Sequence, residues 1–420
     1  MAARATRRLA PPLEHRILMT VTLCLLAFGA VMVYSASSST AVLGGSGYGT
    51  GEFFTYLMAA GLGLIAMRVC ERRGLDLLSE QTVRLLLFGS FALLLAVMVP
   101  GIGRDYNGAR RWFGFGPIQF QPSELMKLVL VLYVTRYLAA HPRRLRGFKQ
   151  AVAPIAVIVA PACLLIAAEP DLGTTLVVVF TVGALMVAAG MPLRYIVAIA
   201  GAVAFFVMLM VLASSYQRAR LLSFLHPWAA SCKSGPCYQA VQGQIAIGSG
   251  GIFGVGLGNS VGKAHYLPEA QTDFILAVIG EELGLLGIFG VACLYAMIAY
   301  AGLRTARRAA TRYAKLLASG LTSLILCQGI LNIFVVLGIA PLTGVPLPFI
   351  SYAPTNLCMM LAAMGLLLGI ARPAATELRS VDDGAGRAPD WRESASDSDR
   401  RRRHGGARRA GAGGRSRAAS

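Results

Sequence analysis

The stretch Tyr266–Glu282 reads YLPEAQTDFILAVIGEE and sets a group of acids at the start of a long apolar segment. The acids are Glu269, Asp273, Glu281 and Glu282. An ionised side chain at the centre of a bilayer costs about 2.5–3.5 kcal/mol or more, so membrane spans rarely carry one without a functional reason. These acids therefore mark the region in which we expect a functional site.

The apolar segment runs from Thr272 to Leu303, which is 32 residues. As a helix it is about 48 Å long at 1.5 Å per residue, whereas about 20 residues are enough to cross a bilayer. The helix must therefore tilt, bend or project outward, and bending points are offered by Gly280, Gly284 and Gly287. With Thr272 as the N-cap, we expect Asp273 in the first helical turn above the bilayer, and Glu281 and Glu282 near its edge.

The composition is that of a membrane protein that crosses the bilayer many times. Of 420 residues, 56% are hydrophobic and 14% are charged, whereas soluble domains carry about 25% charged residues. The net charge of +19 comes largely from the segments between apolar runs and from the C-terminal region. This distribution is typical of cytoplasmic loops of inner-membrane proteins, so we expect no nucleic-acid partner.

About ten apolar segments are long enough to span a core of about 30 Å. They cover residues 17–36, 53–69, 83–101, 124–140, 151–168, 172–190, 195–213, 272–303, 315–338 and 354–371. The first has no clear cleavage site and is interpreted as a retained span. Lys and Arg gather in alternate connections, which the positive-inside rule assigns to the cytoplasm, together with both termini.

The sequence thus predicts an all-α polytopic protein of the bacterial cytoplasmic membrane. Residues 1–16 form a cytoplasmic N-terminus, 17–373 a transmembrane domain, and 374–420 a disordered basic cytoplasmic tail. A large extracytoplasmic loop, 214–271, separates the seventh and eighth spans. Within it, the alternating glycines and apolar residues of Gln244–Gly258 indicate a packed, re-entrant segment where backbones approach closely.

Two cysteines of this loop, Cys232 and Cys237, lie outside the predicted cytosolic side. Their spacing and compartment favour a small disulfide-closed hairpin. A metal site would need further ligands, and only His226 and His265 are at hand. We therefore predict no metal site here.

Three further charged groups lie at the predicted outer face. Arg110 and Arg111 stand beside Trp112, a combination that suits recognition of a diphosphate because guanidinium groups bind phosphate oxygens in pairs; interfacial anchoring is the alternative. Glu124 and Lys127 are spaced for an ion pair on one helical face, with substrate contact as the alternative. Asp171 is either a helix cap or a functional acid.

Seven motifs in order give the chain a resemblance to the SEDS (shape, elongation, division and sporulation) family of the FtsW/RodA type. They are MVYSAS at 32–37, NGARRW at 107–112, FQPSELMK at 120–127, PDLGTT at 170–175, IAIGSGG at 245–251, GLGNSVGKAHYLPEAQTDFILAVIGEELG at 256–284 and PLTGVPLPFISY at 341–352. The wording of 256–274 resembles the FtsW branch more than the elongation branch. One departure stands after ISY, where the family has two glycines and a serine and this chain has Ala353-Pro354-Thr355-Asn356.

The resemblance implies a peptidoglycan glycosyltransferase that polymerises lipid II, the undecaprenyl diphosphate-linked disaccharide peptide, at the outer face of the membrane. It makes Asp273 the general base, and assigns substrate binding to Arg111, Arg110, Glu124, Lys127, Asp171, Glu269 and Lys263. Because the diphosphate leaves as an anion, one carboxylate suffices, unlike the pair used by most glycoside hydrolases.

The resemblance also implies a class B penicillin-binding protein transpeptidase and other divisome membrane proteins as partners, at the division septum. No cofactor is firmly implied, although the diphosphate could carry a divalent cation such as Mg or Mn.

Two other functions are consistent with a polytopic membrane protein. A transporter that flips the lipid-linked precursor would carry paired charges near the bilayer midplane, on broken helices or in internal repeats. The acids here cluster at one face and no repeat is detectable, which favours an enzyme. A division scaffold with weakened catalysis, suggested by Ala353-Pro354, is disfavoured by the presence of Asp273.

Overall fold

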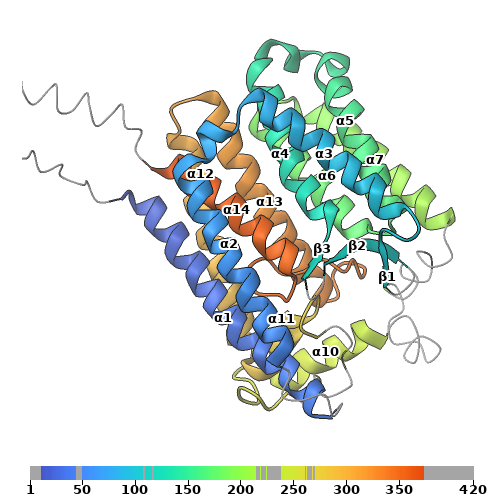
Figure 1. The fold of residues 1–420 in the computed structure, drawn as a ribbon, viewed down its shortest axis with the longest axis vertical. Coiled ribbons are helices and arrows are strands. Elements are labelled where there is room, and N and C mark those ends of the chain that lie inside the picture. The colour runs from blue at the N-terminus through green and yellow to red at the C-terminus, as the bar shows by residue number, and fades with distance from the viewer. Residues whose placement is uncertain are drawn as a thin grey trace, which may run out of the picture. The chain divides into compact units, whose positions relative to one another are not determined.

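A computed structural model describes residues 11–43, 50–106, 109–115, 118–213, 238–260 and 270–372, with the single positions 218, 224, 262 and 267. The described residues are largely helical, so the predicted all-α class is confirmed (Figure 1). The helices are α1 (Leu13–Leu43), α2 (Thr50–Leu77), α3 (Glu80–Met98), α4 (Pro122–Ala140), α5 (Phe148–Ala168), α6 (Leu172–Ala188), α7 (Leu193–Ala213), α10 (Tyr238–Gly250), α11 (Ile275–Glu282), α12 (Gly284–Arg308), α13 (Arg312–Val336) and α14 (Pro354–Ala371), with a short 3₁₀ helix, η1 (Pro142–Arg146).

Nine of the ten predicted apolar segments each coincide with one helix of the structure, and the segment 272–303 coincides with two, α11 and α12. Within the described ranges, seven helices are long and apolar enough to cross a membrane: α1, α2, α3, α5, α12, α13 and α14. Two shorter apolar helices, α6 and α7, join them, and α4 is of crossing length but carries Glu124, Lys127 and Arg136. The protein is therefore an integral membrane protein, while the number of crossing helices stays a prediction.

The helices pack around two hydrophobic cores. One core combines α1, α2, α11, α12, α13 and α14, and the other combines α3, α4, α5, α6 and α7. Helices α4 and α13 contribute to both cores and bury residues on all their faces. The polar residues on these two helices consequently lie inside the protein, where the two cores meet.

A small antiparallel sheet, which the sequence analysis did not predict, precedes α4. Its strands are β1 (Arg104–Tyr106), β2 (Ala109–Phe115) and β3 (Ile118–Phe120), in the order β1-β2-β3. Phe113 of β2 faces Phe120 of β3 in the register, and Arg104 of β1 faces Trp112. The sheet fixes the arginine pair of β2 at the start of α4.

The predicted single helix from Thr272 to Leu303 is broken, which corrects the sequence-based expectation. Helix α11 ends at Glu282 and α12 begins at Gly284, whose φ is +68°. A backbone segment, residues 251–256, fills the gap: Val255 N donates to Glu281 O (3.0 Å), and Leu285 N donates to Gly251 O (2.9 Å). A Cβ at Gly284 would lie 2.4 Å from the carbonyl oxygen of Ile252, so only glycine fits. The predicted close backbone approach of Gln244–Gly258 is confirmed.

Glu281 and Glu282 are buried inside the protein. Their expected place near the edge of the bilayer stays a prediction. Ser35 Oγ of α1 donates to Glu282 Oε1 (2.7 Å) and Oε2 (3.0 Å). Ser260 Oγ and the backbone N of Gly262 (3.2 Å) donate to Glu281. Hydrogen bonds from distant segments therefore compensate for the burial of these two acids.

Several predictions fall outside the described residues. They concern Cys232, Cys237, Lys263, Glu269, half of the loop 214–271, and the two terminal segments. The proposed domain boundaries also stay predictions.

Candidate active site

Asp273 lies in the turn of residues 270–274, directly before α11. The N-cap of α11 is Phe274 and not Thr272, so the expectation that Asp273 belongs to the first helical turn is wrong. The side chain of Asp273 is partly exposed, whereas that of Phe274 is buried. Burial of the next residue anchors the turn, while Asp273 itself stays partly exposed.

The connection between α13 and α14 forms a wall beside Asp273. A Cβ at Gly344 would lie 3.2 Å from Asp273 Oδ2, and Gly344 has a φ of +70°. On its other side the same connection meets the first turn of α6, because a Cβ at Gly173 would lie 2.4 Å from Thr343 O. Tyr352 N also donates to Gln271 O (2.9 Å). The segment 343–346 is thus held between Asp273 and the start of α6.

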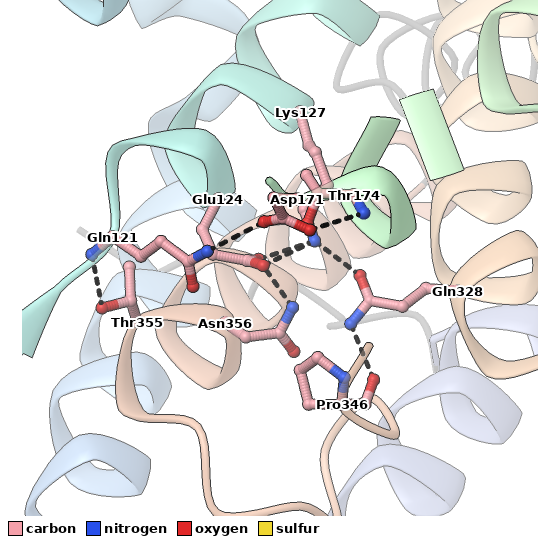
Figure 2. A network of polar contacts seen from close by, with 9 residues as sticks. All are labelled: Gln121, Glu124, Lys127, Asp171, Thr174, Gln328, Pro346, Thr355 and Asn356. Carbon is pink, nitrogen blue, oxygen red and sulfur yellow. Dashed lines mark hydrogen bonds and ion pairs between the residues drawn. The ribbon is translucent and has the colours of Figure 1, made fainter. Parts of the chain in front are cut away.

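The predicted Glu124–Lys127 ion pair is confirmed and is buried (Figure 2). Lys127 Nζ lies 2.8 Å from Glu124 Oε1 and 2.7 Å from Oε2. Lys127 also donates to Gln328 Oε1 of α13 (2.8 Å), and Asn356 Nδ2 of α14 donates to Glu124 Oε2 (2.6 Å). The side chains of Lys127 and Glu124 are 0% and 2% exposed, so both are enclosed by other groups of the protein. The alternative, a contact with substrate, stays a prediction.

Asp171 is a helix cap, as one of the two interpretations predicted. Its Oδ1 accepts from Thr174 N (3.0 Å) at the start of α6. Its Oδ2 accepts from Gln121 Nε2 (3.1 Å), which ties α6 to the residue before α4 (Figure 2). The acid therefore joins two helices of the site by means of both its oxygens.

Arg111 lies on β2 and reaches the turn between α5 and α6. Its Nε donates to Glu169 O and its Nη2 to Pro170 O, each at 2.7 Å. Arg110, the neighbour, is exposed. Two of the five N–H groups of Arg111 hold the backbone, which leaves three donors for a ligand.

Glu169, at the end of α5, is a further buried acid beside Arg111. Its side-chain oxygens are buried and accept no hydrogen bond from the described residues. Burial raises the pKa of Glu169 to about 8; the Asp171 carboxylate adds to the rise, and the Arg111 guanidinium opposes it. At neutral pH the side chain is largely protonated, so it adds little negative charge near Arg111.

Four polar residues of the site were missed from the sequence. Gln328 and Asn332 stand four residues apart in the apolar helix α13, a spacing that puts both on one face and could have revealed them. Asn356 donates to Glu124, and Thr355 Oγ1 donates to Gln119 O (2.7 Å) while accepting from Gln121 N (3.2 Å). Thr355 and Asn356 belong to the departure from the family pattern at 353–356. No local sequence pattern indicated which residues they would contact.

The departure itself is compatible with the fold. Pro354 occupies the first turn of α14, where a missing N–H costs nothing. Ala353 has a φ of −151°, which does not require glycine.

Within the described ranges, no group of three or more His, Cys, Asp or Glu side chains is placed to hold a metal ion. A divalent cation carried by the diphosphate stays a prediction.

The sequence matches the profile of the cell cycle protein family that comprises FtsW, RodA and SpoVE, over residues 15–376. Among its relatives, stage V sporulation protein E of Bacillus subtilis is 38% identical over 375 residues, which are 87% of this chain and 98% of the relative. The probable peptidoglycan glycosyltransferase FtsW of Geobacter metallireducens is 37% identical over 356 residues, 84% of this chain and 93% of that protein.

Solved structures agree. A chain of a peptidoglycan synthase complex that coordinates polymerization and crosslinking is 30% identical, with a TM-score of 0.68 over 84% of this chain and 96% of that chain. The rod shape determining protein RodA of Thermus thermophilus is 28% identical, with a TM-score of 0.60 over 87% of this chain and 97% of that one. The chain therefore belongs to the FtsW/RodA/SpoVE family of cell cycle proteins.

Proposed function

We propose that this protein is a peptidoglycan glycosyltransferase that polymerises lipid II on the outer face of the bacterial cytoplasmic membrane, with Asp273 as the general base. Membership of the family and the similarity to FtsW relatives support the activity.

One observation carries the choice of base. Of the described acids around the site, Glu124, Asp171, Glu169, Glu281 and Glu282 are buried, whereas Asp273 is partly exposed in a turn outside the helices. Glu52 of α2 is also partly exposed, but it accepts a hydrogen bond from Gln271 Nε2 (3.3 Å). A general base has to come within hydrogen-bond reach of the proton that it removes. Asp273 meets this condition without any rearrangement of the helices.

The proposed step is a glycosyl transfer between two lipid-linked sugars. The acceptor hydroxyl loses its proton to the Asp273 carboxylate, and its oxygen forms a bond to the anomeric carbon of the donor sugar. The bond from that carbon to the undecaprenyl diphosphate breaks, and the diphosphate leaves with the electron pair. Because the leaving group is already an anion, it needs positive charge and not a proton.

Arg111 and Arg110 are the proposed source of that charge. Arg111 is held by two backbone carbonyls, which orients its guanidinium before a ligand arrives. The neighbouring Glu169 is protonated at neutral pH and therefore competes little for the arginine. A divalent cation on the diphosphate would add to the same neutralisation.

The orientation in the membrane is supported by clusters of basic side chains at one end of the helices. Glu14 pairs with Arg304 and Arg308, each at 2.7 Å. Glu71 pairs with Arg372 (2.6 Å) and Arg68 (3.0 Å). These residues lie at the start of α1 and the ends of α2, α12 and α14, at the opposite end from α10 and α11 (Figure 1). By the positive-inside rule this end is cytoplasmic, with both termini, and Asp273 faces outward.

We further propose a class B penicillin-binding protein as the transpeptidase partner, and the division septum as the site of action with other divisome membrane proteins. The similarity to a peptidoglycan synthase complex and to FtsW relatives supports this proposal.

Transporters use broken helices at their binding sites, and this protein has a broken helix, α11–α12, with two buried acids. Here the backbone of residues 251–256 fills the break, and Glu281 and Glu282 accept hydrogen bonds from Ser260, Gly262 and Ser35. The two acids are thus engaged in holding neighbouring segments together, which supports an enzyme over a flippase.

The test is polymerisation of purified lipid II by the full-length protein, alone and with a class B penicillin-binding protein, compared with Asp273→Asn. We expect the variant to fold and insert but to form no glycan strands. Strand formation by Asp273→Asn at the parent rate would overturn the assignment of the base. A cytoplasmic location of Thr272→Cys in labelling of intact cells would overturn the proposed topology.

A further inference from the structure

We propose that Gln328 and Asn332 of α13 are positioning residues for Asp273, and that the buried Glu124–Lys127 pair acts on the reaction through them. This inference rests on the proposed role of Asp273 as the base.

The two amides are buried at the level of the site. Gln328 is 0% and Asn332 is 1% exposed, and both lie on one face of α13. An amide removed from water is costly unless it is hydrogen-bonded. The contacts of these side chains therefore contribute strongly to what α13 holds in place.

Asn332 joins the turn of Asp273 to the wall beside it. Its Nδ2 donates to Asp273 O (2.8 Å) and to Val345 O (2.7 Å). Both amide N–H groups are then engaged, so the two carbonyls fix the orientation of the amide. Because Asp273 O belongs to the residue that carries the carboxylate, this contact sets where the Cα–Cβ bond of Asp273 begins.

Gln328 fixes the other end of the same wall. Its Nε2 donates to Pro346 O (2.9 Å), next to Val345. The acceptors of the two amides are backbone carbonyls of two segments outside the helices, 270–273 and 343–346. Such segments depend on side chains to fix their backbone.

Lys127 extends this arrangement to the buried ion pair (Figure 2). It donates to Gln328 Oε1 (2.8 Å), so the oxygen of the amide faces Lys127 and the nitrogen faces Pro346. A charged donor also polarises the amide and strengthens its second hydrogen bond. Glu124 and Asn356 hold Lys127 from the other side, since Glu124 accepts from both.

A displacement of the segment 343–346 would directly affect the carboxylate of Asp273. A Cβ at Gly344 would lie 3.2 Å from Asp273 Oδ2, so the backbone of residue 344 borders the reactive group. A shift of 1 Å in a catalytic group can cost on the order of 100-fold in rate. Loss of either amide should therefore lower kcat, whereas loss of a substrate contact would raise KM.

The first experiment measures kcat and KM for lipid II with full-length Asn332→Leu and Gln328→Leu, in the presence of the transpeptidase partner. We expect kcat to fall roughly 10- to 100-fold, with KM unchanged within about twofold. Thr322→Val is the matched control: Thr322 is equally buried in α13, but its hydroxyl bonds to Ala318 O of the same helix (2.7 Å), so its kcat should match the parent.

The second experiment combines Lys127→Met with Gln328→Leu. If Lys127 acts through Gln328, the double variant should be about as slow as the slower single variant. If the two substitutions instead multiply in their effects on kcat, or if Lys127→Met raises the KM for lipid II, Lys127 would be assigned to the substrate. Either result would overturn this part of the inference.

A third variant keeps the inference testable if Asn332→Leu fails to fold. Gly344→Ala keeps both amides but crowds Asp273 Oδ2, so we expect a fall in kcat even if Asn332→Leu is unstable. If Asn332→Leu, Gln328→Leu and Gly344→Ala all kept the parent kcat while Asp273→Asn was inactive, the present inference would be overturned. The proposed role of Asp273 would not be affected. Full activity of Asp273→Asn would instead overturn the proposed base.

Discussion

Arg111 of β2 donates a hydrogen bond from Nε to the carbonyl oxygen of Glu169, 2.7 Å away, and a second bond to Pro170 O. The arginine assigned to the diphosphate is therefore also a clamp on the turn between α5 and α6. Because this turn leads into the Asp171 cap of α6, the clamp connects the sheet to the helices of the site.

Arg111→Ala should raise the KM for lipid II roughly tenfold or more, because a charge-assisted hydrogen bond contributes about 1.5–3 kcal/mol. Arg111→Lys keeps the charge but cannot hold both carbonyls at once, so it should lower the Tm while restoring part of the binding. Kinetics and thermal unfolding of both variants in detergent provide the measurement. A lower Tm with an unchanged KM for lipid II would mean that Arg111 holds the turn between α5 and α6 but does not bind the substrate.

Glu169→Gln should remove a pH-dependent loss of stability. The folded-state pKa of Glu169 is about 8 against an ordinary value of 4.5, so the folded protein keeps a proton that the unfolded chain releases. The stability linked to this proton is complete below about pH 4.5 and is lost as the pH rises to about 8. The Tm of Glu169→Gln relative to the parent should therefore rise between pH 5 and pH 9. Glu80→Gln, at an exposed position, is the control and should show no such trend.

Gly284→Ala should destabilise the protein by about 1–3 kcal/mol, because Gly284 has a φ of +68° and its missing Cβ leaves room for Ile252 O. Gly290→Ala in the same helix is the matched control, since nothing lies within 4 Å of the added Cβ. Thermal unfolding in detergent compares the two. Equal Tm values would mean that the helix break tolerates a side chain.

Replacement of Ala353-Pro354 by two glycines should lower the free energy of unfolding by about 0.4–1 kcal/mol per position, because it adds freedom to the unfolded chain. Neither native residue has a conformation that requires glycine. We expect kcat for lipid II to stay at the parent value. A large gain in kcat would mean that the departure at 353–356 weakens catalysis in this chain.

Local sequence patterns were sufficient for the parts of the fold that depend on neighbours in the chain. Apolar runs of about 20 residues predicted the helices, because the burial of apolar side chains in a bilayer depends only on length and composition. The Glu124–Lys127 pair followed from residues three apart on one helical face, and the Asp171 cap followed from an acid before an apolar run. The choice of Asp273 as the base stays a prediction.

Packing between distant segments decided the rest. Ser35 meets Glu282 across 247 residues, and Asn332 meets Asp273 across 59. The break between α11 and α12 exists because the segment 251–256 satisfies its backbone groups. No periodicity within a single helix carries that information, because the partner of a buried polar group is set by which helices meet in three dimensions. The chain's own pattern thus predicts which polar residues could take part in chemistry, and the packing of the helices decides which of them are buried and which stay partly exposed.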